Sequence, residues 1–170
     1  MIGTGQAVWP RPSSLCYAPL IVEDISPDLV RAQVRTFWKV YCSKREEEFA
    51  KLYSPDATIL EIDSRRIEPA LLMVARRARE LFSPRSSLNA ELGRIDVQIL
   101  EPGVAVASYG LHFHLVRVAA SGKRFESDMP ATRVTQVFQR DQSGVLRILH
   151  EHMSAGRVSP PKELPDSAPQ

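Results

Sequence analysis

Residues 133–154 read RVTQVFQRDQSGVLRILHEHMS, and this stretch decides the fold of the chain. β-branched and aromatic residues recur at every second position of its two arms, a period that is typical of paired β-strands. The four residues 141–144, DQSG, are turn formers, so the stretch predicts a β-hairpin. The second arm ends in a polar cluster, HEHMS at 150–154, which places candidate functional side chains at the end of a strand.

Strand patterns fill the whole second half of the chain. Turn sequences that contain glycine separate these segments, and short turns join sequential neighbours as antiparallel pairs. The sequence therefore predicts a meander of four strands, at about 88–100, 104–118, 124–140 and 145–153.

Helical patterns come before the meander. Ser26 is a predicted N-cap with Pro27 at the first helical position, and a broad apolar face follows at helical spacing. A second, short helix is predicted to start at Ser43, where Glu46 completes a capping box. The apolar face of the first helix consists of Val30, Val34, Phe37, Trp38 and Tyr41.

A strand and a third helix link these helices to the meander. Residues 57–63, ATILEID, predict a strand whose alternation puts Glu61 and Asp63 on one face. Residues 69–82 predict a helix. Its predicted apolar side holds Leu71, Ala75, Ala78 and Leu81 or Phe82, and its opposite, solvated side holds Arg76, Arg77 and Arg79.

This order of elements predicts an α+β domain, in which three N-terminal helices cover one face of a curved antiparallel sheet. The domain occupies residues 26–155. Residues 1–25 are apolar but contain prolines, which predicts an arm on the body or on a partner subunit. Residues 156–170 are polar and proline-rich, which predicts a disordered tail.

Composition excludes several classes of function. The 22 Lys and Arg residues are scattered among 20 Asp and Glu, with a net charge of +2, so nucleic acid is not an expected partner. No run of apolar residues is long enough to cross a bilayer, so we expect no membrane partner. Two cysteines without a pairing or zinc pattern favour a reducing, cytoplasmic setting. No phosphate loop or dinucleotide fingerprint occurs, so no cofactor is expected.

Three passages resemble the nuclear transport factor 2-like superfamily, in particular its SnoaL-like and ketosteroid-isomerase-like members. Residues 52–58, LYSPDAT, are similar to the passage that leads these proteins into their first strand, and 133–135, RVT, to the start of the penultimate strand. Residues 146–154, LRILHEHMS, resemble the closing strand, with Leu146 in place of a tryptophan. The resemblance implies a cone-shaped barrel with a pocket at its open end and a homodimer formed through the sheet.

Glu61 is the strongest candidate for a catalytic residue. It stands five residues after Asp56, where the general base of ketosteroid-isomerase-like enzymes follows, so the resemblance implies a base at Glu61 or at Asp63. A carboxylate in an apolar pocket has a raised pKa, which suits it to removing a proton next to a carbonyl. The alternative is that both carboxylates are solvated or paired with Arg65 or Arg66. The oxyanion groups of the isomerases have no match, so isomerase activity itself is not implied.

All four histidines occur as His-x-His pairs, so both rings of each pair lie on one face of a strand. The predicted strand 124–140 separates the pairs by about 10 Å, so one metal ion could hold all four only if the sheet curled severely, and no metal site is expected. One pair together with Glu61 or Asp63 is the remaining alternative for a metal site. We expect His112, His150 or His152 as acid or orienting group and His114 as a substrate contact. Structural hydrogen bonding, or a place in the dimer interface, is the alternative.

Three further residues are candidates for substrate binding. Arg133 is placed to bind a carboxylate or enolate bidentately, and Tyr41 and Trp38 end the apolar face of the first helix. Alternatively, Arg133 pairs with Asp128 or Glu151, and the two aromatic residues belong to the core.

The sequence therefore predicts a protein that binds a small, largely apolar organic molecule with a carbonyl or carboxylate group. If it is an enzyme, we expect acid-base catalysis without a cofactor, of the isomerase, cyclase or dehydratase type. The competing hypothesis is a non-catalytic module for ligand binding or oligomerisation.

Overall fold

The computed structural model describes residues 24–62, 64–119 and 121–156. The predicted arm and tail lie almost entirely outside these residues, and so does Asp63. The elements are α1 (Pro27–Cys42), α2 (Glu46–Ala50), β1 (Tyr53–Leu60), β2 (Glu68–Pro69), α3 (Ala70–Leu81), β3 (Ser86–Glu101), β4 (Val104–Val118), β5 (Arg124–Arg140) and β6 (Leu146–Ala155).

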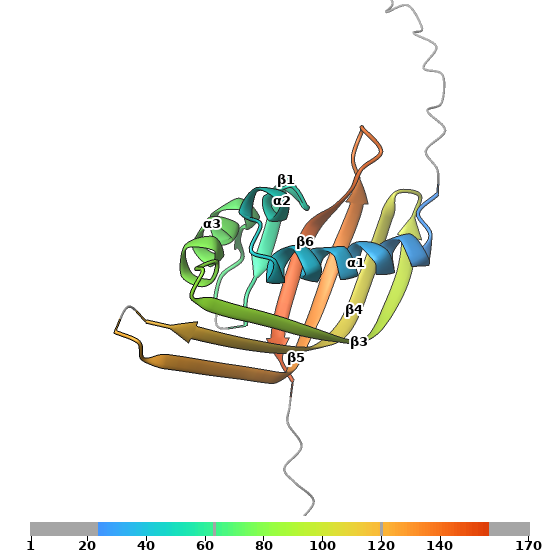
Figure 1. Ribbon diagram of the computed structural model, residues 1–170. Helices are drawn as coiled ribbons and strands as arrows, with labels where there is room; N and C mark the ends of the chain where they lie inside the picture. Colours follow the sequence, from blue (N-terminus) through green and yellow to red (C-terminus); the bar gives the residue numbers. More distant parts are fainter. Residues whose placement is uncertain (1–23, 63, 120, 157–170) are drawn as a thin grey trace, which may run out of the picture.

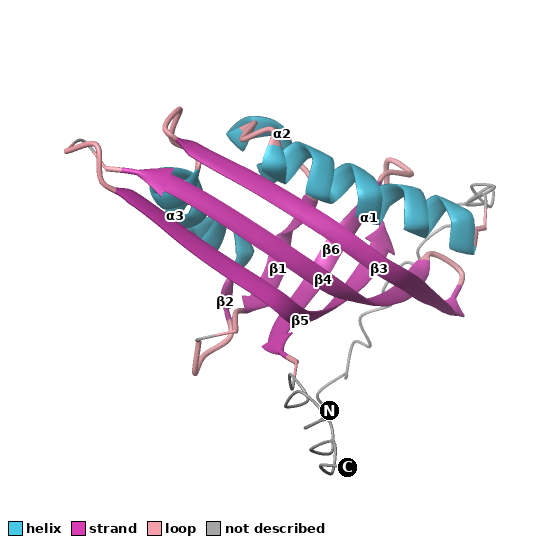
Figure 2. Ribbon diagram, turned by 60° about the horizontal axis from the view of Figure 1, so that its bottom comes forward, coloured by secondary structure: helices cyan, strands magenta, loops and turns pink. Residues whose placement is uncertain are grey.

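The six strands form one open, curved sheet in the order β2-β1-β6-β5-β4-β3 (Figures 1 and 2). Strands β3 to β6 are the predicted antiparallel meander. The prediction of an all-antiparallel sheet is wrong for one pair, because β1 runs parallel to β6. Parallel neighbours need a long connection, and here residues 61–145, which include α3 and the strands β3 to β5, lie between the two strands.

The first helix begins as predicted and packs on the sheet. The Ser26 hydroxyl accepts a hydrogen bond from the Leu29 amide at 3.2 Å, and Asp28 lies in the first turn, where its charge suits the helix dipole. Its predicted apolar face is buried, and the helix lies across one face of the sheet, against β3 and β4 (Figure 2). We call this helix-covered side of the sheet the inner face and the opposite side the outer face.

The second helix does not begin at Ser43. The Ser43 hydroxyl instead donates to the carbonyl of Lys39 at 2.7 Å and closes α1, while Lys44 has a positive φ of 58°. That backbone turn ends the first helix, and α2 follows after Arg45, whose side chain makes no cap. The predicted capping box is therefore wrong. Strand β1 also begins four residues earlier than predicted, at Tyr53.

Burial along the meander identifies the inner face. In β4 the residues at 105, 107, 109, 111 and 113 are buried, and in β5 those at 132, 134, 136 and 138 are buried. Side chains alternate between the faces of a strand, so the residues between them lie on the outer face. His112 and His114 are among these outer residues, on the opposite side from Tyr109, Leu111 and Phe113.

A β-bulge in β6 reverses the alternation of that strand. Ile148 pairs with Phe138 while His150 pairs with the preceding residue Val137, so Leu149 is an extra residue. As a result Glu151 follows Ile148 onto the inner face. His150 and His152 therefore lie on the outer face.

Helix α3 has the predicted extent but a different buried side. Leu71 and Leu72 are 48% and 66% exposed, so the predicted apolar stripe through Leu71 is wrong. The buried residues recur at i, i+3, i+4, i+7 and i+8, namely Ala70, Met73, Val74, Arg77 and Ala78. Arg77 consequently points into the domain, not into solvent.

Candidate functional site

A pocket of about 230 Å³ lies between α1, α3 and the inner face of the sheet. One side of it is polar and comes from the end of β1 and from α3, with Glu61, Arg76, Arg77 and Glu80. The other side is apolar and includes Trp38, Leu111, Phe113, Leu115, Met129 and Met153.

Aromatic packing holds the apolar wall of the pocket in place. Trp38 and Tyr41 contact each other edge-on at 5.4 Å between ring centroids, and Phe113 lies 5.8 Å from Tyr41. The Trp38 indole donates a hydrogen bond of 2.8 Å to the Tyr109 hydroxyl, which lies deeper in the core. Edge-to-face contacts of this kind add to the burial of the rings, so this wall is rigid.

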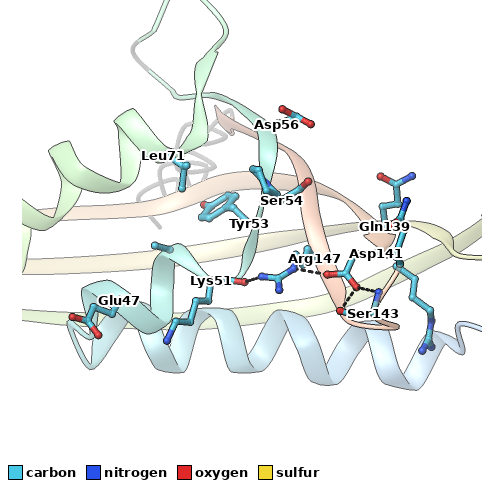
Figure 3. A pocket seen from close by; sticks show the side chains of 14 residues that line it. Glu47, Lys51, Tyr53, Ser54, Asp56, Leu71, Gln139, Asp141, Ser143 and Arg147 are labelled. Carbon is cyan, nitrogen blue, oxygen red and sulfur yellow. Dashed lines mark hydrogen bonds and ion pairs between the residues drawn. The ribbon is translucent and has the colours of Figure 1, made fainter.

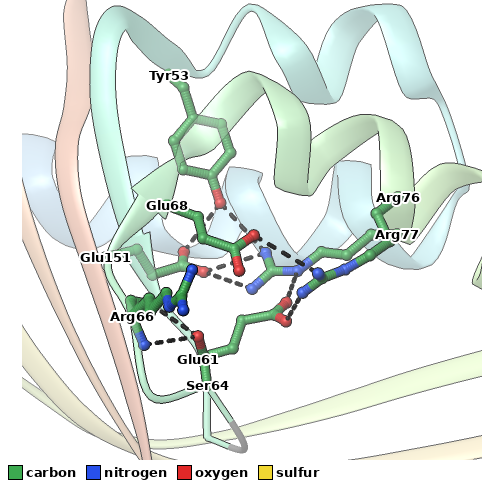
Figure 4. A network of polar contacts seen from close by, with 8 residues as sticks. All are labelled: Tyr53, Glu61, Ser64, Arg66, Glu68, Arg76, Arg77 and Glu151. Carbon is green, nitrogen blue, oxygen red and sulfur yellow. Dashed lines mark hydrogen bonds and ion pairs between the residues drawn. The ribbon is translucent and has the colours of Figure 1, made fainter.

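Arg77 is the centre of an ionic network behind the pocket (Figure 4). Its side chain is only 6% exposed. Its Nε donates to Glu61 at 2.7 Å, and both Nη1 and Nη2 donate to one oxygen of Glu151 at 3.1 Å. Burial alone would lower the pKa of Arg77, but the neighbouring groups, Glu151 foremost and Glu61 among them, together outweigh this effect and raise it. The guanidinium therefore stays charged inside the protein.

Glu151 is fully buried and has every oxygen engaged. Its second oxygen accepts hydrogen bonds from the Tyr53 hydroxyl at 3.1 Å and from the Gln136 amide at 2.8 Å. Burial raises the pKa of Tyr53, and the negative charge of Glu151 raises it further, so this hydroxyl stays a donor. A buried charge with this set of partners is the arrangement that avoids the cost of an unpaired one.

Both oxygens of Glu61 accept hydrogen bonds from arginines. One binds Arg77 and the other binds Nη2 of Arg76 at 2.8 Å, while Nη1 of Arg76 lies 3.5 Å from Glu68. A general base needs an oxygen aimed at the proton that it removes. The geometry therefore makes Glu61 an anchor for two arginines.

The structure brings some of the predicted site residues together and separates others. Glu61, Tyr41 and Trp38 line the pocket. Arg133 alternates with the buried residues Thr132 and Val134, so it is exposed on the outer face, where it donates to a backbone carbonyl. Its predicted place near the interior is therefore wrong.

All four histidines lie on the outer face, and three of them have local partners. His112 is 2.5 Å from Asp128 and His114 is 3.4 Å from Glu126, while His150 shares a hydrogen bond of 2.8 Å with Thr58. The hydrogen bond from His112 lowers the pKa of Asp128. Strand β5 separates the two pairs, and the sheet separates both from the pocket. A single site that combines Glu61 with these histidines is therefore excluded by the fold.

Neither a protein-family model nor a curated protein sequence matches the chain. Solved structures do match. An uncharacterized protein with a cystatin-like fold from Caulobacter vibrioides has a TM-score of 0.58 and 18% identity, and the match covers 76% of this chain and 89% of that chain. For an NTF2-like protein with a cystatin-like fold from Novosphingobium aromaticivorans the TM-score is 0.54 and the identity 15%, over 74% of this chain and 79% of that one. The chain has the NTF2-like, cystatin-like fold.

A third similar structure is a putative calcium/calmodulin dependent protein kinase II association domain from Xanthomonas campestris. Its TM-score is 0.58 with 20% identity, over 78% of this chain and 89% of that chain. At such identities the similarity establishes the NTF2-like fold and leaves function to the site, because one fold serves many functions. In the part of the chain that the structure describes, no helix is long and apolar enough to span a bilayer.

Arg77 and Glu151, which hold the site together, were not among the residues predicted for it. A signal for Arg77 existed, because it stands four residues after Met73 and three after Val74, on one helical stripe. No comparable signal existed for Glu151. A strict period of two from Ile148 would place it on the outer face, and only the bulge brings it inside.

A second, broader hollow lies at the other end of the NTF2-like sheet, between α2, β1 and the β5–β6 turn (Figure 3). Arg147 is central to it, with Nε donating to Asp141 at 2.8 Å and Nη1 donating to the backbone carbonyl of Lys51. Because this arginine is already paired within the protein, it fixes the turn against α2. The hollow is therefore a result of how the β5–β6 turn packs against α2.

Proposed function

We propose that the chain binds a small, largely apolar organic molecule in the inner pocket, as its resemblance to SnoaL-like proteins implies. The observation that carries this proposal is the pocket itself, which has a rigid aromatic and aliphatic wall and one polar side. Concave sites of this composition are typical of small-molecule binding.

The size of the pocket limits the ligand. A protein cavity of about 150 Å³ holds one benzene molecule, so 230 Å³ corresponds to about nine non-hydrogen atoms. The ligand, or the part of it that enters the domain, is therefore about as large as a substituted benzene ring.

Binding is better supported than acid-base catalysis. Two arginines engage both oxygens of Glu61, and no histidine reaches the pocket. A catalytic role for Glu61 would require a ligand that displaces at least one arginine from it. Binding without turnover needs no such change, and it is the function that the geometry favours.

A matched pair of variants tests the proposal. Leu115 lines the pocket, and Val116 is the next residue of β4, on the opposite face. Cumene, an apolar molecule of suitable size, is titrated into labelled protein and followed by amide chemical shifts. We expect saturable shifts around the pocket, which Leu115→Trp abolishes and Val116→Trp retains. Equal binding by both variants, or no binding by the unmodified protein, would contradict the proposal.

A second function, assembly, is supported by the outer face of the sheet. Leu60, Val106 and Val137 are partly buried there, on a surface that none of the described helices covers. The similar structure from Xanthomonas campestris is described as an association domain. We propose that the chain forms a homodimer through this face, as the resemblance implies.

A further inference from the structure

The Tyr41 hydroxyl makes no hydrogen bond to another described residue, and it is not among the fully buried side-chain atoms without a partner, so it is open to the pocket. The side chain of Tyr41 is 5% exposed and lines the pocket, whereas the hydroxyls of Tyr53 and Tyr109 each have a hydrogen bond. Burial raises the pKa of Tyr41, so its hydroxyl keeps its proton at physiological pH. A ligand that displaces water from this hydroxyl must supply an acceptor in its place, because a donor left without one is costly.

Arg77 contributes a second donor beside it. A guanidinium has five N–H groups, and Arg77 uses four of them, on Glu61, Glu151 and the Tyr53 hydroxyl. One hydrogen of Nη2 has no acceptor among the residues that the structure describes. The guanidinium carbon lies 6.0 Å from the centre of the Tyr41 ring, and both residues line the pocket.

Around these donors, carboxylates already outnumber arginines. Arg76 and Arg77 pair with three carboxylates, those of Glu61, Glu68 and Glu151, and the carboxylate of Glu80 also lines the pocket. A ligand carboxylate would lose its hydration and meet guanidinium groups that are already neutralised. An uncharged acceptor would satisfy the same donors without adding a charge.

We infer that the pocket selects an uncharged acceptor, such as the oxygen of a ketone, ester or amide, over a carboxylate of the same shape. The acceptor oxygen lies against the Tyr41 hydroxyl and the remaining N–H of Arg77, and the apolar part of the ligand lies against Trp38 and Leu111. This inference rests on the proposed binding function and names the ligand class for it.

Three probes of one shape test the inference. Acetophenone, benzoate and cumene have the same number of non-hydrogen atoms and differ at the polar end, as a ketone, a carboxylate and a hydrocarbon. Each is titrated into the full chain at pH 7 and followed by amide chemical shifts. We expect acetophenone to bind roughly five- to tenfold more tightly than cumene, the increment of one neutral hydrogen bond, and benzoate to bind less tightly than acetophenone.

The variant Tyr41→Phe separates the hydroxyl from the ring. It should abolish the preference for acetophenone, so that acetophenone and cumene bind with similar affinity, and continued binding of cumene shows that the pocket is intact. Tighter binding of benzoate than of acetophenone would overturn the inference, and so would an equal loss of both affinities in Tyr41→Phe. If cumene binds and acetophenone binds no more tightly, the inference fails and the binding function stands. If none of the three binds, both fail.

Discussion

At the scale of single residues, Arg77 and Glu151 form an ion pair inside the domain, with side chains 6% and 0% exposed. Taking two charges out of water costs several kcal/mol for each ion, and their attraction repays this only with good geometry and further hydrogen bonds. Tyr53 and Gln136 supply those bonds to Glu151, and Glu61 supplies one to Arg77. The largest loss of stability is therefore expected when only one of the two side chains is removed, because the other charge is then buried without a partner.

The substitution Arg77→Met should destabilise the domain by about 3–5 kcal/mol, because it leaves Glu151 buried without a counter-charge. The double variant Arg77→Met/Glu151→Gln should recover part of this loss, since its buried groups are neutral. Urea unfolding followed by circular dichroism measures both. Stability losses that simply add in the double variant would show that the two side chains are not coupled.

At the scale of elements, the turn between β5 and β6 is organised by one carboxylate. Asp141 accepts hydrogen bonds from the amide and hydroxyl of Ser143 at 2.9 and 2.6 Å and from Arg147 at 2.8 Å. Gly144 has a φ of 83°, which favours glycine there. The hydrogen bond from Arg147 is the main cause that holds the pKa of Asp141 below its usual range.

This depressed pKa predicts a dependence of stability on pH. An aspartate has a pKa of about 3.9 in an unfolded chain, so the contribution of Asp141 is complete above that pH and is lost as the pH falls toward the folded value. Asp141→Asn should therefore lower the urea midpoint at pH 7, and the difference from the unmodified protein should shrink below about pH 4. The control is Asp96→Asn, which alters an exposed ion pair with Arg94. A difference for Asp141→Asn that stays constant down to pH 2 would refute the assignment.

At the scale of the whole molecule, the sheet of the NTF2-like fold separates two surfaces with different chemistry. The inner face holds the pocket and the ionic network, and the outer face holds both histidine pairs. A third surface, at the start of α3, exposes Ile67, Leu71 and Leu72. The outer face and the surface at the start of α3 are therefore two alternative candidates for a subunit interface.

Charge substitutions on each surface discriminate between them. Val137 lies on the outer face, and Leu72 is 66% exposed on α3. If the outer face forms the homodimer, Val137→Glu should shift the protein to monomers in sedimentation velocity, whereas Leu72→Glu should remain dimeric. Dissociation by Leu72→Glu alone would place the interface on α3, and a monomeric unmodified protein would remove the dimer from the proposal.

The sequence by itself determined the features that depend on neighbours along the chain. The cap at Ser26 and the apolar face of α1 are local patterns, and so are the turns and alternation of the meander. Of the predicted site residues, Tyr41, Trp38 and Glu61 do line the pocket. Local periodicity was sufficient for Trp38 and Tyr41, which stand on the apolar face of α1, whereas Glu61 was selected by the resemblance of the preceding passage to ketosteroid-isomerase-like enzymes.

Only the tertiary structure decided which face the remaining polar residues occupy. One extra residue in β6 turned Glu151 inward and both nearby histidines outward, and a different buried side of α3 brought Arg77 beside it. A period of two or of 3.6 fixes which residues share a face, whereas the choice of face is made by partners far away in the sequence. Arg77 and Glu151 are far apart in the sequence, and each needs the other as a buried counter-charge. Their pairing therefore depends on the packing of α3 against the sheet.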